Sequence, residues 1–125
     1  MSGRIYVASA HGLVIAERDG RDWKITGQHL ESNPITSVAA CDQLVLAGTR
    51  SGIWRSQDGG ATWEGANEGL SIKHIRWLAC QAGANGYLLA GTEPAGIYLS
   101  HDGGSTWDRR LEVDALRSKH GWYLP

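Results

Sequence analysis

His74 and Arg76 are the residues of this sequence best placed, by type and spacing, to bind a charged ligand. They are two residues apart in a stretch typical of a β-strand, so both side chains point to the same side of it. An imidazole next to a guanidinium is well suited to grip an anion or a carboxylate. In the competing interpretation, Arg76 pairs with Glu93 or Glu68 and only holds neighbouring elements together.

Other kinds of chemistry have little support. The histidines show no metal-site spacing such as His-x-x-x-His, and no Cys-x-x-Cys is present. The glycine pairs fit hairpin turns, whereas phosphate binding uses a glycine-rich connection from a strand to a helix. Serine hydrolase motifs are absent too. From the missing metal-site spacing and the missing phosphate loop, we predict no metal and no cofactor. The five histidines are His11, His29, His74, His101 and His120.

Composition limits the class of protein. The 125 residues carry a net charge of −1, and there is no basic excess of the kind that binds nucleic acid. No apolar run is long enough to span a membrane, and the first twenty residues lack the charged start and long apolar core of a signal peptide. Seventeen glycines beside three prolines fit many tight turns between short strands.

The most informative feature is an eight-residue run that occurs twice. Ser56–Trp63 reads SQDGGATW and Ser100–Trp107 reads SHDGGSTW, with six of the eight residues identical. A degenerate third copy, Gly12–Trp23, aligns on its glycine and tryptophan but has Arg18 at the aspartate position. The tryptophans at 23, 63 and 107 are 40 and 44 residues apart, which is the spacing of β-propeller blades.

The residue types in this run predict a structural turn. Asp58 is expected to accept hydrogen bonds from backbone amides of its own turn, and Gly59 and Gly60 to take positive φ. Thr62 favours an extended backbone, and Trp63 brings a large apolar face to cover the hairpin. We therefore assign a structural role to the two sets Ser56, Asp58, Gly59, Gly60, Thr62, Trp63 and Ser100, Asp102, Gly103, Gly104, Thr106, Trp107.

The Ser-x-Asp-Gly-Gly-x-Thr-Trp run resembles the Asp-box, or BNR repeat, of sialidase-like β-propellers. The resemblance implies that the box forms an outer turn of each blade, away from the ligand-binding face. It does not extend to sialidase chemistry, because Arg4-Ile5-Tyr6 departs from the Arg-Ile-Pro motif and no tyrosine stands out as a nucleophile. Many Asp-box propellers, sortilin ectodomains and photosystem-assembly factors among them, bind proteins and cleave nothing.

We predict an all-β chain of about three four-stranded antiparallel blades, a partial or half propeller that forms a single domain over residues 1–125. The predicted blades cover 4–27, 35–66 and 74–111, followed by a tail at 112–125. The predicted strands are 4–9, 12–17 and 22–26; 35–41, 43–49, 52–57 and 61–65; and 74–81, 87–92, 96–101 and 105–111. The first blade has no inner strand of its own.

Propeller rings generally need four to eight blades. We therefore expect either the front part of a longer propeller or self-association, in which two copies close a six-bladed ring head to tail. Cys41 and Cys80 lie at matching points of successive repeats, where neighbouring blades usually diverge beyond the Cα separation of about 7 Å that a disulfide allows. Buried free thiols and a cytoplasmic location are therefore predicted.

Propellers usually bind ligands at the mouth of the central channel, opposite the Asp-box turns. The loops and strand starts that reach this mouth carry the candidate ligand-binding residues His11, Arg50, Glu68, His74, Arg76 and Glu93. The leading hypothesis is a non-catalytic module that binds a protein or a carbohydrate there. One alternative is a divergent sialidase-like glycoside hydrolase completed by a missing portion or a second copy. Another is a structural half-propeller that functions only on assembly.

Overall fold

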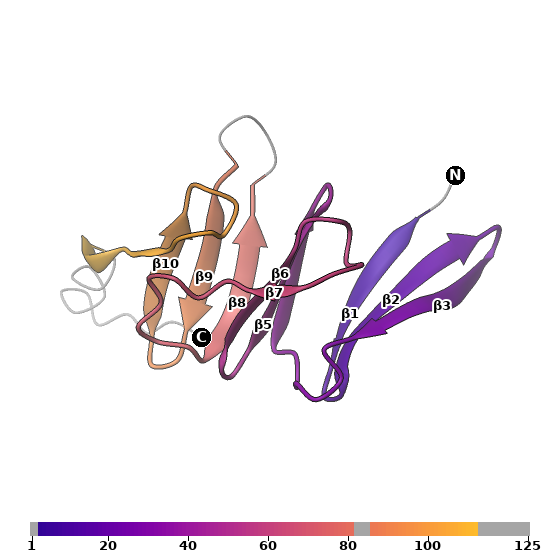
Figure 1. The fold of residues 1–125 in the computed structure, drawn as a ribbon, viewed down its shortest axis with the longest axis horizontal. Coiled ribbons are helices and arrows are strands. Elements are labelled where there is room, and N and C mark those ends of the chain that lie inside the picture. Colours follow the sequence, from indigo (N-terminus) through magenta and orange to yellow (C-terminus); the bar gives the residue numbers. More distant parts are fainter. Residues whose placement is uncertain (1–2, 82–85, 113–125) are drawn as a thin grey trace.

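A computed structural model describes residues 3–81 and 86–112 of the chain. Its strands form three separate antiparallel sheets that stand side by side in sequence order (Figure 1), and we call them blades 1, 2 and 3. In this described part, no helix has the length and apolar character that crossing a membrane requires. The predicted tail lies outside the described residues from 113 onward.

The strands occur where the sequence predicts them. Blade 1 consists of β1 (Arg4–Ser9), β2 (Gly12–Asp19) and β3 (Asp22–His29). Blade 2 consists of β4 (Ser37–Cys41), β5 (Leu44–Thr49), β6 (Gly52–Ser56) and β7 (Glu64–Gly65). Blade 3 consists of β8 (Ile75–Cys80), β9 (Leu88–Thr92), β10 (Gly96–Ser100) and β11 (Asp108–Arg109).

Blade 1 has the order β1-β2-β3, so it lacks an inner strand, as predicted. Its last strand is long, because a two-residue turn joins Asp19 directly to Asp22. The last strands of blades 2 and 3 are shorter than predicted, with two residues each instead of five and seven. The cause is that the repeated turn occupies the chain up to Trp63 and Trp107 before pairing resumes.

The hydrophobic core lies between the blades and not within any one of them. Leu13 and Ile15 of blade 1 pack with Ile35 and Ala47 on the side of blade 2 that faces them. A second cluster joins the other side of blade 2 to blade 3, and its members include Leu46, Ile53, Leu78, Leu88, Tyr98 and Trp107. Fully burying a side chain of this size stabilises the fold by about 1.5–3 kcal/mol. The blades are therefore held together mainly by the faces that they share.

The prediction of free thiols is wrong, because Cys41 and Cys80 form a disulfide between blades 2 and 3 with their Cα atoms 6.3 Å apart. The registers explain it: Cys41 pairs with Leu44, whereas Cys80 pairs with Leu88, one step further along its blade. A shift of one residue moves a side chain to the opposite face of a strand. The two sulfurs therefore point toward each other.

This disulfide also bears on location. Structural disulfides persist mainly in oxidising compartments, and thiols of cytosolic proteins are kept reduced. The predicted cytoplasmic location depended on Cys41 and Cys80 being free thiols, so the disulfide removes its premise.

Candidate binding site

The repeated turn of blade 2 is organised around the Asp58 carboxylate. Its Oδ1 accepts hydrogen bonds from the Ser56 hydroxyl at 2.7 Å and from the Thr62 amide at 2.9 Å, and its Oδ2 accepts one from the Thr62 hydroxyl at 2.6 Å. Gly59 and Gly60 have φ of +74° and +101°, as predicted. The Gly60 amide donates to the Ser56 hydroxyl at 2.8 Å, which closes the turn.

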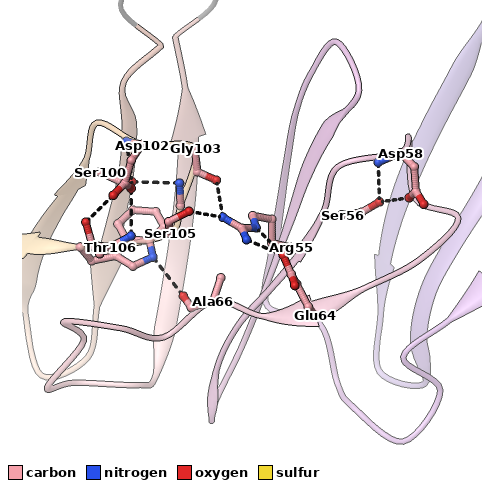
Figure 2. Close-up of polar contacts among 12 residues, drawn as sticks. Arg55, Ser56, Asp58, Glu64, Ala66, Ser100, Asp102, Gly103, Ser105 and Thr106 are labelled. Carbon is pink, nitrogen blue, oxygen red and sulfur yellow. Dashed lines mark hydrogen bonds and ion pairs between the residues drawn. The ribbon is translucent and has the colours of Figure 1, made fainter.

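The turn of blade 3 repeats these bonds. Asp102 accepts from Ser100 at 2.9 Å and from the amide and hydroxyl of Thr106 at 2.9 and 2.5 Å (Figure 2). Bonds from Thr62 and Thr106, followed by those from the serines, lower the pKa of both aspartates to about 2. A carboxylate held ionised in this way is a poor proton donor, so these residues serve as turn anchors.

The two tryptophans that follow these turns have different environments. The indole Nε1 of Trp63 donates to the Gly60 carbonyl of its own turn at 3.0 Å, and the ring is half-buried. Trp107 is only 2% exposed, and its Nε1 donates to the Ala66 carbonyl of blade 2 at 3.0 Å (Figure 2). A Cβ atom at Gly69 would lie 2.0 Å from the Trp107 carbonyl oxygen, so glycine is required for this close approach.

An arginine links each turn to the preceding blade. Arg55 of blade 2 donates to the Gly103 carbonyl at 3.2 Å and to the Ser105 hydroxyl at 2.9 Å, while it is ion-paired with Glu64 (Figure 2). Its side chain is 11% exposed. This guanidinium therefore ties blade 2 to the turn of blade 3.

Blade 1 makes the same link from a different strand. Arg4 donates to the Gly59 carbonyl at 3.0 Å and is ion-paired with Glu17, and the Tyr6 hydroxyl donates to the same carbonyl at 2.8 Å. Sequence reasoning missed both links. Nothing in the repeat could have revealed Arg4, because it lies on β1 whereas Arg55 lies on β6.

The predicted ligand-binding residues gather, with one exception, at the opposite end of the blades. There tight turns join β1 to β2, β5 to β6 and β9 to β10, with Ser9 paired to Gly12, Thr49 to Gly52 and Thr92 to Gly96. In Figure 1 the turn between β1 and β2 lies at the lower end, and the turn between β2 and β3 at the upper end. His11, Arg50 and Glu93 are exposed on these turns.

Arg76 and Glu93 form the ion pair that sequence reasoning offered as one interpretation. Their side chains meet at 2.8 Å and remain about half exposed, at 47% and 56%. The Glu93 amide donates to the His74 carbonyl at 2.9 Å, which joins the turn to the start of β8. An exposed pair of this kind adds little to stability, so its charges stay accessible to a ligand.

Glu68 is the exception. Its backbone carbonyl accepts a hydrogen bond from the Trp107 amide at 2.9 Å. Its side chain lines an open cleft of about 490 Å³ with Arg55, Lys73 and Ser105, beside the turn of blade 3. Glu68 therefore lies beside the turn of blade 3 and apart from Arg76.

A second open cleft, of about 560 Å³, lies between blades 1 and 2 beside the repeated turn. It is polar and lined by Arg4, Glu17, Asp42, Gln43 and Asp58, among others. Sequence reasoning did not select this cleft. The groups in the described residues do not form a cluster of His, Cys, Asp and Glu that could hold a metal ion.

The comparison with solved structures supports the fold. No family model matches the chain, and no curated protein matches it. A solved structure of a β-propeller, described as "YCF48 bound to D1 peptide", matches with a TM-score of 0.65 and 20% sequence identity. The match covers 85% of this chain and 36% of that one, so this chain spans about a third of its length. The three sheets are therefore blades of a partial β-propeller.

Proposed function

We propose that this chain is a non-catalytic, protein-binding part of a β-propeller. It holds a peptide segment of its partner on the surface formed by His11, Arg50, His74, Arg76 and Glu93, which we call the channel-mouth surface. The observation that carries the proposal is the exposed Arg76–Glu93 pair beside His74, at the end of the blades opposite the repeated turns. It is supported by the similar propeller, whose description names a bound peptide.

The charges of this surface favour an acidic peptide. It holds two arginines and two histidines against one glutamate, and Arg50 and Arg76 are both exposed. A guanidinium binds a carboxylate through paired, charge-assisted hydrogen bonds, which gives orientation as well as affinity. The ion pair with Glu93 leaves the Arg76 side chain 47% exposed, so a peptide carboxylate can reach its guanidinium.

A non-catalytic role is supported by the ionised state of the aspartate carboxylates in the two repeated turns. Glycoside hydrolysis uses a carboxylic acid with a raised pKa as its proton donor. Asp58 and Asp102 have a lowered pKa, and hydrogen bonds within their turns engage both of their oxygens. We further propose that these turns are Asp-boxes that serve as scaffold, on the strength of the shared Ser-x-Asp-Gly-Gly-x-Thr-Trp run.

The test is a screen of random peptides and of glycans immobilised on arrays, with the wild-type chain and two variants. We expect acidic peptides to be retained and Arg76→Ala to weaken the best one about tenfold or more, since buried or ordered charge pairs give coupling of about 1.5 kcal/mol upward. Arg21→Ala, an exposed arginine in the blade 1 turn, is the matched control and should bind as the wild type does.

Three results would overturn the proposal. The first is that the chain retains glycans but retains no peptide. The second is that Arg21→Ala loses as much binding as Arg76→Ala. The third is that the folded chain binds no probe. Glycan binding that depends on Arg76 would keep the surface and replace the partner class.

A further inference from the structure

The outward face of blade 1 is built from positions that are buried in the other blades. The pairing of β1 with β2, β5 with β6 and β9 with β10 aligns the blades, because Ser9–Gly12, Thr49–Gly52 and Thr92–Gly96 occupy the same place in each. The residues two and four before this serine or threonine point toward the preceding blade. They are Ala47 and Val45 in blade 2, Ala90 and Leu88 in blade 3, and Val7 and Ile5 in blade 1.

These matched positions differ sharply in exposure. In blades 2 and 3 they are at most 2% exposed, because the preceding blade covers them. In blade 1, Val7 is 42% and Ile5 44% exposed, and Ile25 on β3 is 65% exposed. The strand registers place Val14, Ala16, Arg18 and Trp23 on the same side, where Val14 is half-buried and Ala16 is 8% exposed. We call this set, Ile5, Val7, Val14, Ala16, Trp23 and Ile25, the open face of blade 1.

Blade 3 has a complementary apolar face on its other side. The registers align Trp77 with Gly91 and Ile97, and Ala79 with Leu89 and Leu99. The side chains of Trp77, Leu89, Ile97 and Leu99 are half-buried there, and we call them the outer face of blade 3. At the matching positions of blade 2, Leu46 and Ile53 are at most 1% exposed, because blade 3 covers them.

The two faces have also lost the same polar link. Wherever one blade packs on the next in this chain, an arginine of the first donates to a glycine carbonyl in the turn of the second. Blade 3 has Leu99 at the position of Arg55, directly before the serine of the turn, and Tyr87 at the position of Arg4, five residues before the serine or threonine that pairs with glycine. Blade 1, in turn, has the two-residue connection Gly20-Arg21 in place of the eight-residue run, and the Gly20 carbonyl already accepts a hydrogen bond from Arg18 of the same blade at 2.8 Å.

The blade without this donor therefore matches the blade whose turn carbonyl is already hydrogen-bonded within the blade. A junction between the outer face of blade 3 and the open face of blade 1 needs no such link, because Arg18, which the register places opposite Trp23, already donates to the Gly20 carbonyl. Rings generally need at least four blades, so in a ring built from these three-blade units the two faces meet on different copies.

From this matching we propose that the open face of blade 1 docks on the outer face of blade 3 of a second copy of the chain. Two such contacts, related by a two-fold axis, close a ring of six blades. Each contact joins two different faces, head to tail, and two such contacts cover both of these faces in each copy. The proposal does not depend on peptide binding, because the channel-mouth surface lies on a different side of the blades.

The experiment is size-exclusion chromatography with light scattering on the full chain and on charge variants of each face. We expect the wild type to have twice the 13.5 kDa chain mass. Ile25→Lys on one face and Leu99→Lys on the other should each halve the mass, because a lysine in an apolar junction leaves a buried charge without a partner. Gln57→Lys, which adds the same charge on an exposed turn residue, should keep the doubled mass.

Circular dichroism confirms that each variant is folded, and Ile97→Lys replaces Leu99→Lys if the latter unfolds. A wild-type chain that stays at 13.5 kDa overturns the proposal. So does a doubled mass that persists in Leu99→Lys and Ile97→Lys, because blade 1 would then meet blade 1 and not blade 3.

Discussion

The two repeated turns have nearly the same internal hydrogen bonds but different surroundings. In both, the aspartate accepts from the threonine amide at 2.9 Å, and the second glycine amide donates to the serine hydroxyl at 2.8 Å in blade 2 and 2.9 Å in blade 3. They differ at the tryptophan that ends each turn: Trp107 is buried and Trp63 is half-buried.

The difference comes from the blade that precedes each turn. The chain leaving blade 2 crosses over Trp107 through Ala66 and Gly69, and any side chain at Gly69 would prevent this approach. Six residues after the tryptophan of blade 1, the place that Gly69 takes in blade 2, the residue is His29, whose ring lies 6.3 Å from that of Trp63. Blade 1 therefore cannot cover Trp63 in the way that blade 2 covers Trp107.

The conformation of each turn and the stability of each turn have different sources. Hydrogen bonds within the turn fix its local conformation, and they are the same wherever the run occurs. The larger stabilisation comes from the neighbouring blade that covers the tryptophan, and it depends on residues some forty positions earlier in the chain. Identical turns should therefore respond differently to identical substitutions.

The largest difference should appear when the two tryptophans are truncated. Trp107→Ala removes a fully buried ring and its bond to Ala66, and we expect a loss of about 3–5 kcal/mol in the free energy of unfolding. Trp63→Ala removes a half-buried ring, and we expect about half as much or less. Urea unfolding of both variants measures the pair, and equal losses would show that the preceding blade contributes nothing.

The disulfide gives the next effect. It ties the inner strand of blade 2 to that of blade 3. Replacing both Cys41 and Cys80 with serine should lower the free energy of unfolding by about 2–4 kcal/mol, which is the usual contribution of a disulfide that closes a loop of this length. Ala40→Ser, an exposed neighbour, is the control. Reduction of the wild type should match the double variant, and stability unaffected by either treatment would contradict the assigned pairing.

Acid should produce the smallest effect, and it acts on both turns alike. The pKa of Asp58 and Asp102 is about 2 in the folded chain, below the ordinary value of 3.8. Their contribution is therefore fully present above about pH 4 and is lost as the pH falls toward 2.

Removing the threonine hydroxyls tests this acid dependence. In the variant with both Thr62→Val and Thr106→Val, the carboxylates lose a hydrogen bond that lowers their pKa, so urea midpoints should fall less steeply between pH 4 and pH 2. Other carboxylates are common to both proteins, so the difference isolates the turns. Parallel pH profiles would show that the hydroxyls do not set the pKa.

Most of the fold follows from the sequence, because it is written in local patterns. The glycines and aspartates of the repeated run specify the turns, and the forty-residue spacing specifies the number of blades. The length of β3 was not predicted, since the loss of the run in blade 1 allows pairing to continue to His29. Local chemistry thus predicts which elements form better than where each one ends.

Contacts between blades were beyond the sequence. The disulfide depends on a one-step difference in register between Cys41 and Cys80, and residue spacing alone does not contain that information. The link from Arg4 to Gly59 joins residues that no repeat relates. The pair of Arg76 and Glu93 was foreseen as one interpretation, because both lie at ends of strands that must meet. The position of Glu68 beside the turn of blade 3 was not predicted.

Native-state hydrogen exchange tests most directly whether the neighbouring blade stabilises the turn. The amides of Thr62 and Thr106 have the same bond to an aspartate, and those of Gly60 and Gly104 have the same bond to a serine. We predict that both amides in blade 3 exchange at least about tenfold more slowly than their counterparts in blade 2, which corresponds to about 1.4 kcal/mol of extra local stability. Equal protection in the two turns would contradict this and would mean that their own hydrogen bonds account for their stability.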